Sequence, residues 1–175
     1  MTEPSAAERA AALPGDDLVP VAEVVLDRAC TLPRPPEQVW PWLVQLGKAR
    51  AGWYLPRRFE YLMPPSRRGL RRIEPRWQGL AVGDVIPDWG GKHATFQVAL
   101  LDPGASLVYW SSRGRTNLSW AIVLHPLAGE RTRLQFRLRL APVRHRRIAE
   151  LAGGFFDQLS ILGLAAGLRE RLTGP

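Results

Sequence analysis

The sequence predicts an α+β fold in which a curved antiparallel β-sheet wraps around one long C-terminal α-helix. Two patterns lead to this prediction. Between residues 141 and 172, apolar side chains recur at steps of three and four, which places them on one helical face: Ile148, Ala152, Phe155, Leu159, Leu162 and Ala166. Ahead of this helix, segments between residues 95 and 140 alternate apolar and polar residues, as strands with one dry face do. Because so apolar a helix must be covered, we expect the sheet to cover it.

The first strand is expected at residues 21–32, where one face carries Ala22, Val24, Leu26, Cys30 and Leu32. Arg28 interrupts this apolar face, so we expect it near an edge or an opening. Prolines at positions 33, 35 and 36 end the strand. Residues 37–46 then predict a short helix that ends at Gly47.

Residues 48–78 form the least regular part of the sequence. A short helix is expected at residues 57–63, and a loop rich in proline and arginine follows at residues 64–77. Loops of this length in compact domains are usually functional or disordered. The aromatic residues of this segment argue against disorder: Trp53, Tyr54, Phe59, Tyr61 and Trp77. We therefore expect an ordered segment that could form a lid.

The remaining strands follow one another closely. A short strand is expected around residues 85–86, and longer ones at residues 95–102, 106–112, 118–127 and 131–140. In the last of these, four apolar residues alternate strictly with Arg133, Gln135, Arg137 and Arg139. We find no internal repeat and no linker. The sequence therefore predicts a flexible N-terminal arm at residues 1–19 and a single domain at residues 20–173.

The charge of the chain raises the question of an anionic partner. The net charge is +8, and Lys48 and Lys92 are the only lysines, so arginine supplies nearly all of the positive charge. Arginine favours bidentate contacts with phosphates and carboxylates. Alternatively, the arginines are spread over solvated faces, since they do not gather into one block. The row Arg131, Arg133, Arg137 and Arg139 follows from strand alternation alone and lacks the interleaved aromatics of single-strand binders. Nucleic-acid binding is therefore not expected.

Several classes of protein are not expected. The single cysteine, Cys30, excludes an internal disulfide and any cysteine-based zinc cluster, and it fits a reducing cytoplasm. No secretory signal is visible, and the uncharged run in the C-terminal helix, residues 158–168, is too short to cross a bilayer core about 30 Å thick. We therefore expect a cytoplasmic protein with no transmembrane segment. The three histidines lack the spacing of a metal site, and no glycine-rich nucleotide motif occurs, so no metal or cofactor is expected.

The order of elements resembles the START-like, or SRPBCC, superfamily with its helix-grip fold. Four local features carry the resemblance over residues 21–172: the segment Pro35-Pro36-Glu37-Gln38-Val39-Trp40-Pro41-Trp42-Leu43, the turn Gly79–Asp84, the strand Ser119–Leu124 with the turn residues Gly129, Thr132, Arg133 and Leu134, and the C-terminal helix. The segment Gly52-Trp53-Tyr54 is similar to that of uncharacterised bacterial members. The resemblance implies a deep apolar cavity between sheet and helix. It implies no single reaction, because the superfamily includes polyketide cyclases and aromatases as well as lipid or quinone carriers.

The candidate site residues are chiefly aromatic. The sequence contains seven tryptophans, and a tryptophan offers a large apolar face with one hydrogen-bond donor. We expect the following residues to bind a ligand: Trp53, Tyr54, Trp77, Phe96, Tyr109, Trp120, Phe136, Phe155 and Leu159. Of these, Trp120, Phe136, Phe155 and Leu159 should form the floor of the cavity. Gly153-Gly154 is expected either to kink the helix beside the ligand or to allow close backbone packing.

No catalytic motif is present, and any catalytic residue would come from Glu60, Tyr54 or His93, the last lying near Asp88 in sequence. The leading hypothesis is a protein that binds a small hydrophobic or aromatic molecule, lipid-like or polyketide-like. The alternative is a polyketide cyclase or dehydratase that uses the same cavity. A second alternative is a peripheral binder of anionic lipid or nucleic acid through surface arginines, with binding that weakens steeply in salt.

Overall fold

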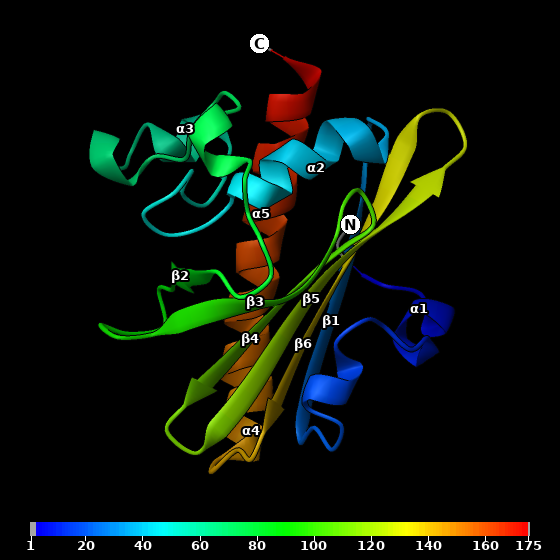
Figure 1. The fold of residues 1–175 in the computed structure, drawn as a ribbon, viewed down its shortest axis with the longest axis vertical. Coiled ribbons are helices and arrows are strands. Elements are labelled where there is room, and N and C mark those ends of the chain that lie inside the picture. Colours follow the sequence, from blue (N-terminus) through cyan, green and yellow to red (C-terminus); the bar gives the residue numbers. More distant parts are fainter. Residues whose placement is uncertain (1–2, 175) are drawn as a thin grey trace.

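In a computed structural model, which describes residues 3–174, a six-stranded antiparallel sheet packs against a long C-terminal helix (Figure 1). The strand order is β1-β6-β5-β4-β3-β2. The strands are β1 (Val24–Leu32), β2 (Val85–Pro87), β3 (Thr95–Asp102), β4 (Ser106–Arg113), β5 (Thr116–Leu127) and β6 (Arg131–Ala141). The predicted α+β class and the curved sheet wrapped on the helix are confirmed.

The register of the strands gives the sheet two chemically different faces. Trp120 lies opposite Tyr109 on β4 and opposite Leu138 on β6, and Phe136 lies opposite Arg28 on β1. Residues directly opposite each other share a face, so these side chains belong to one face, which we call the inner face. The other face, the outer face, carries Arg133, Gln135, Arg137 and Arg139.

The C-terminal helix lies against the inner face. It begins at α4 (Arg146–Ile148), continues through a π-helical segment η4 (Ala149–Gly153) and ends with α5 (Gly154–Thr173). It therefore starts later than the predicted residue 141. The face of α5 that packs against the sheet carries Gly154, Ile161, Leu164, Ala165, Leu168 and Leu172.

This finding corrects the predicted buried stripe of the helix. Phe155 is 65% exposed, Leu159 is 52% exposed and Leu162 is 40% exposed. Apolar residues surround the helix almost evenly, so their spacing fits more than one buried face. The sequence pattern therefore does not show which helix face is buried, and the face that contacts β1 is the buried one.

The second half of α5 forms the core together with α2 (Pro36–Gln45). Segment 53–55 crosses the helix closely at Gly163 and Gly167. A Cβ atom on Gly167 would lie 2.6 Å from the carbonyl carbon of Tyr54, so only glycine permits this approach. The irregular region that follows contains α3 (Arg57–Glu60), η2 (Pro65–Arg67) and η3 (Pro75–Trp77).

The N-terminal segment covers part of the outer face. It contains α1 (Ala6–Ala10) and the short η1 (Asp16–Leu18). Arg133 donates to Glu8 at 2.6 Å and Arg137 donates to Asp16 at 2.9 Å. Arg137 also donates to Asp27 and to backbone carbonyls of this segment, and it is only 3% exposed. Residues 3–19 of the predicted flexible arm thus have defined partners, because the arginine row supplies donors for them.

Candidate functional site

An aromatic cluster lies on the inner face with Trp120 at its centre. Trp120 stacks on Tyr109 with ring centroids 5.7 Å apart and on Phe136 at 6.3 Å. Phe96 lies 6.0 Å from Trp120 and 5.7 Å from Tyr109. The alternation of β3, β4, β5 and β6 places all four rings on the same face, as the sequence predicts for Trp120.

Trp53 joins this cluster from outside the sheet. Its ring stacks on Trp120 at 6.1 Å and meets the edge of Trp89 at 5.8 Å. Its indole N–H donates to the carbonyl oxygen of Ser160 on α5 at 3.2 Å. Trp53 therefore bridges the sheet and the helix, and it fixes the spacing between them at this level.

Part of the cluster is accessible to solvent. Tyr109 and Phe136 are buried, with 4% and 2% exposure, whereas Trp53, Phe96 and Trp120 are half-buried. The two buried rings therefore anchor the cluster, and the three half-buried rings leave part of their aromatic surface accessible.

A charged pair lies on the same face. Arg28 donates to the carbonyl oxygen of Gly154 at 2.9 Å, and its Nε lies 3.1 Å from Oδ2 of Asp157. Burial raises the pKa of Asp157 to about 6, and the charge of Arg28 opposes this rise. Arg28 lies opposite Phe136 in the β1–β6 register, so the pair is next to the aromatic cluster.

The pair is close but poorly aligned. Nε of Arg28 and Oδ2 of Asp157 are both buried, and neither has an aligned hydrogen-bond partner within the described residues. Buried polar groups without such partners are uncommon and require an explanation. A polar group of a ligand could form hydrogen bonds with both atoms.

The sequence pattern singles out only half of this pair. Arg28 breaks the apolar face of its strand, whereas Asp157 is not among the predicted site residues. The signal was available, because a lone carboxylate in an apolar stretch of helix is the natural partner of an arginine on an inward face.

A second charged pair borders the cluster at its opposite edge. Arg113 lies over the ring of Phe96, with its guanidinium carbon 5.2 Å from the ring centroid. Arg113 also forms an ion pair with Asp88. Cation–π contact of this kind holds the arginine over the aromatic ring.

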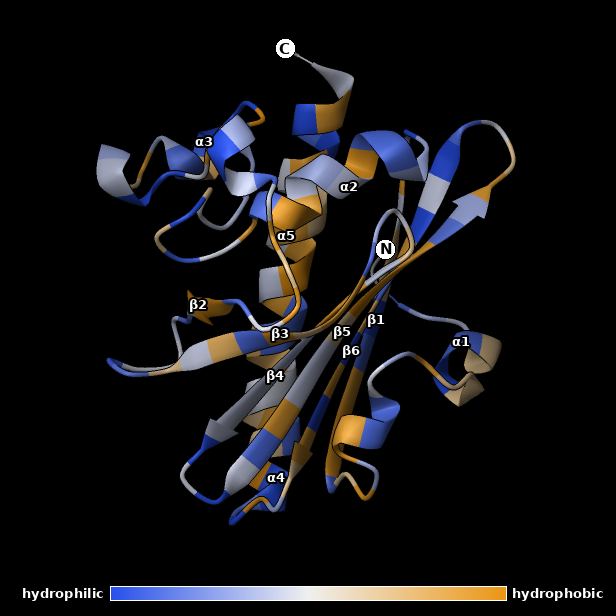
Figure 2. Cartoon of the chain, viewed as in Figure 1, coloured by the Kyte–Doolittle hydropathy of each residue, from blue (hydrophilic) through white to orange (hydrophobic). Residues whose placement is uncertain are grey.

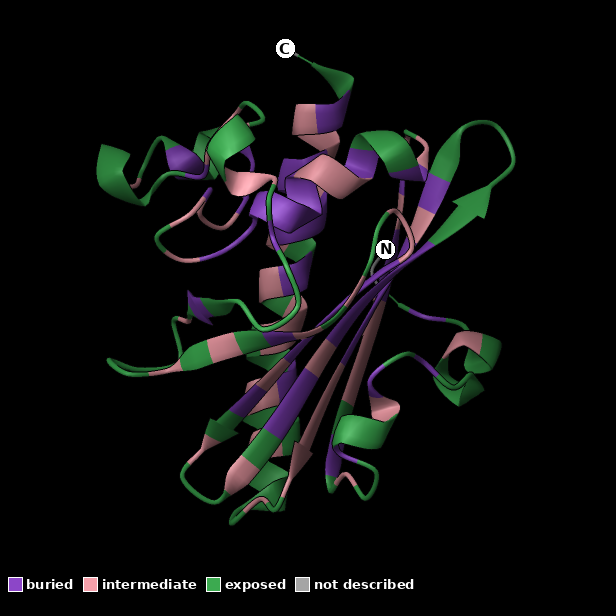
Figure 3. Ribbon diagram, viewed as in Figure 1, coloured by how far each residue is buried: buried purple, intermediate pink, exposed green. Residues whose placement is uncertain are grey.

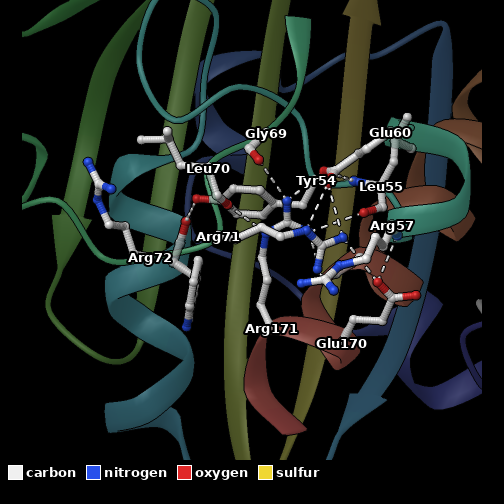
Figure 4. A network of polar contacts seen from close by, with 12 residues as sticks. Tyr54, Leu55, Arg57, Glu60, Gly69, Leu70, Arg71, Arg72, Glu170 and Arg171 are labelled. Atoms are coloured by element: carbon white, nitrogen blue, oxygen red, sulfur yellow. Dashed lines mark hydrogen bonds and ion pairs between the residues drawn. The ribbon is translucent and has the colours of Figure 1, made fainter. Parts of the chain in front are cut away.

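Two of the three candidate catalytic residues belong to a different network, at the C-terminal end of α5 (Figure 4). Glu60 is 3% exposed and accepts from Arg171 at 2.6 Å. Arg171 also donates to the carbonyl oxygens of Leu55, Gly167, Gly69 and Leu70. These bonds occupy the guanidinium, which joins segment 55–70 to the helix.

Tyr54 is part of the same structural core. Its hydroxyl donates to the carbonyl oxygen of Trp42 at 2.9 Å and accepts from Gln45 at 3.0 Å. Burial raises the pKa of Tyr54. Tyr54 and Glu60 are thus satisfied within the protein, while His93 is exposed in the loop before β3. The structure does not bring these three together.

Four predicted ligand residues lie outside the aromatic cluster, and one of them is Tyr54, which bonds to Trp42 and Gln45. Trp77 lies between Arg50 and Arg76, with guanidinium carbons 4.8 and 5.0 Å from its ring centroid. Phe155 and Leu159 are largely exposed, so they do not form the floor of an enclosed cavity as expected. The cluster itself therefore unites Trp53, Phe96, Tyr109, Trp120 and Phe136.

Two surface hollows of about 290 and 410 Å³ lie near the network of Figure 4. Both are lined by Arg57 and Arg71, and the first also by Glu170 and Arg171. Because Arg71 is paired with Glu60 and Glu170, these linings suit ions and water better than an apolar ligand. Among residues 3–174, no group of three or more His, Cys, Asp or Glu side chains is placed to hold a metal ion.

Comparison with solved structures shows the same fold in bacterial proteins of low sequence identity. A protein from Rhodobacter sphaeroides aligns with a TM-score of 0.56 and 16% identity, over 88% of this chain and 95% of that chain. CalU16 from Micromonospora echinospora aligns with a TM-score of 0.54 and 13% identity, over 85% of this chain and 78% of that chain.

DynU16, a protein of the dynemicin biosynthetic locus, aligns with a TM-score of 0.52 and 16% identity. The alignment covers 85% of this chain and 47% of that one. No family model matches the sequence, and no curated protein matches it. At these identities the likeness establishes the helix-grip fold alone.

Proposed function

We propose that this chain is a START-like protein that binds a small hydrophobic or aromatic molecule against the aromatic cluster. The observation that carries the proposal is the cluster of five aromatic rings centred on Trp120, of which two are buried and three are half-buried. Trp53 connects this set to the helix, so a ligand there would contact sheet and helix together. The likeness to CalU16 and DynU16 is consistent with the proposal but does not identify a ligand.

The site favours a flat ligand with one polar group. Offset stacking between aromatic rings contributes about 0.5–1.5 kcal/mol beyond the area that it buries. A hydroxyl or carbonyl next to the rings could bond to Arg28 or Asp157, whose facing atoms lack aligned partners. A polyketide-like aromatic has both a flat ring system and a polar substituent, whereas an unsubstituted acyl chain has neither.

Titration calorimetry with 2-naphthol, a hydroxylated bicyclic aromatic, tests this proposal. Trp53→Leu should weaken binding about tenfold, because it removes one stacking surface and the link to the helix. Trp77→Leu is the matched control and should leave the affinity unchanged. Equal weakening in both variants, or no binding of the probe by the native protein, would contradict the proposed site.

A second candidate function is catalysis of a cyclase or dehydratase type in the same place. One observation favours it: the pKa of Asp157 is raised to about 6, near the range in which a carboxyl can both give and take a proton at neutral pH. Asp157 replaces Glu60, Tyr54 and His93 as the candidate acid–base. Asp157→Asn should abolish turnover of a polyketide-like substrate while 2-naphthol still binds; retained turnover would exclude this role.

The arginine row of β6 gives little support to an anion-binding function. Arg133 and Arg137 are engaged by Glu8, Asp16 and Asp27, and Arg139 donates to the carbonyl oxygens of Val19 and Pro20. A phosphate would have to displace these partners.

A further inference from the structure

The first half of the C-terminal helix exposes a continuous apolar surface, which we call the apolar stripe. Its members are 40–77% exposed: Ile148, Leu151, Phe155, Phe156, Leu159 and Leu162. They belong to about four turns of one helix. Figure 2 shows apolar residues on this part of the helix, and Figure 3 shows exposed residues along it. Contiguous exposed apolar surface of this kind usually marks an interaction site.

Charged groups are turned away from the apolar stripe. Residues 148–162 contain only two charged side chains, Glu150 and Asp157. Asp157 points toward Arg28 on the sheet, and Glu150 pairs with Arg146 one turn earlier at 2.7 Å. The stripe is therefore uninterrupted by charge.

Four exposed arginines lie at the end of the molecule at which the stripe begins. Arg144, Arg146 and Arg147 are exposed just before it. The β4–β5 turn, with the exposed Arg115, lies at the same end (Figure 1), because Asn117 pairs with Ala141 and Thr116 donates to the carbonyl oxygen of Pro142. We call these four arginines the basic collar. An apolar surface next to the basic collar complements a bilayer surface in which anionic headgroups lie above acyl chains.

We propose that the first half of the C-terminal helix docks on the surface of an anionic bilayer, with the apolar stripe in the interface and the basic collar among the headgroups. This surface lies apart from the β6 arginine row, and docking does not depend on the ligand proposed above. It differs from simple charge attraction, because apolar burial supplies part of the affinity.

The same helix does not insert across the membrane. Residues 146–173 are long and apolar enough to span a bilayer. However, Leu164 and Leu168 are fully buried in the core, and Arg171 anchors the helix to segment 55–70. Insertion would require the core to be dismantled, whereas docking uses only surface that is already exposed.

Self-association through the stripe fits the charges less well. The chain carries a net charge of +8, and three exposed arginines precede the stripe, so two copies would bring like charges together. An anionic surface would instead gain from the same arginines.

Co-sedimentation with vesicles tests the docking surface. The native protein should bind vesicles of phosphatidylcholine with one quarter phosphatidylglycerol, bind pure phosphatidylcholine vesicles far more weakly, and lose part of its binding in high salt. The double variant Leu151→Gln/Phe156→Gln should bind about tenfold or more weakly, since two inserted side chains are replaced. Both positions are exposed, so the variant should retain the native melting temperature.

The matched control replaces two comparably exposed apolar residues elsewhere, Tyr61→Gln and Leu62→Gln, which are 77% and 81% exposed. This control should bind as the native protein does. Three outcomes would overturn the proposal: absence of binding to anionic vesicles, equal loss in the control, or a stable dimer in solution that Leu151→Gln/Phe156→Gln dissociates.

Discussion

Asp157 is the residue whose environment departs most from what its neighbours in sequence suggest. It sits in an apolar stretch of α5, yet it faces Arg28 across the inner face of the sheet at 3.1 Å. Burial outweighs the nearby positive charge, so the proton is held more tightly in the folded chain than in the unfolded one. In the folded protein, the Asp157 carboxyl therefore gains and loses its proton at a pH close to neutral.

This carboxyl gives a pH dependence of stability with a definite sign. The pKa of Asp157 rises from 3.8 to about 6 on folding, so the folded chain binds more protons between these values. The free energy of unfolding should therefore fall as the pH rises through this window, by about 2–3 kcal/mol from this group. Asp157→Asn removes the contribution.

Urea denaturation of both proteins at pH 4 and pH 7 measures it. The stability of the native protein relative to Asp157→Asn should fall by about 2 kcal/mol between the two pH values. If that stability difference does not change between pH 4 and pH 7, or if it increases with pH, the attraction of Arg28 dominates. The pKa of Asp157 would then not be raised on folding.

At the scale of elements, two glycines of the C-terminal helix have opposite surroundings. A Cβ atom on Gly167 would lie 2.6–2.7 Å from backbone atoms of Tyr54 and Leu55, which cannot move aside easily. A Cβ atom on Gly153 would meet no described atom within 4 Å. The first glycine serves close packing, and the second stands beside open space.

Alanine at these positions should therefore act in opposite directions. Gly167→Ala should lower the free energy of unfolding by about 2 kcal/mol, because the clash exceeds the gain in helix propensity. Gly153→Ala should raise it by about 0.5–1 kcal/mol, because only the propensity changes. Chemical denaturation measures both, and stabilisation by Gly167→Ala would disprove the close crossing of segment 53–55.

The elements also show what the sequence could predict and where pattern alone fails. The strict alternation of β6 and the position of Trp120 on the inner face follow from a period of two, so both were predictable. The buried face of α5 was not, because the helix is apolar all round and spacing cannot choose between Ile161 and Phe155. The order of elements predicted the fold, but the site also depends on Arg28 and Asp157, which are 129 positions apart in sequence.

At the scale of the whole molecule, the sheet is occupied on both faces. The helix covers the inner face, and residues 3–19 lie against the outer face through Arg133, Arg137 and Arg139. Carboxylates near one terminus thus neutralise arginines more than a hundred residues away, a pairing that no local pattern reveals. Arg133 holds the pKa of Glu8 at about 2.

Removing these carboxylates should have two linked effects. Glu8→Gln/Asp16→Asn should lower the free energy of unfolding by about 2 kcal/mol, because Arg137 is buried and would lose one of its two carboxylate partners. The freed arginines should also delay elution from a heparin column. The control variant Glu37→Gln/Asp102→Asn changes the net charge by the same amount at exposed positions. It should elute from heparin earlier than Glu8→Gln/Asp16→Asn does. Identical behaviour of the two double variants would mean that the N-terminal segment does not cover the arginines.

A ligand that binds between the sheet and the helix should contact the rings of Trp53 and Trp120 first. The most direct test follows the indole N–H resonances of ¹⁵N-labelled protein by NMR while 2-naphthol is added. If the ligand binds at these rings, the resonances of Trp53 and Trp120 should shift together and saturate, while that of Trp77 stays in place. Shifts confined to Trp77, or none at saturating 2-naphthol, would contradict binding at these rings.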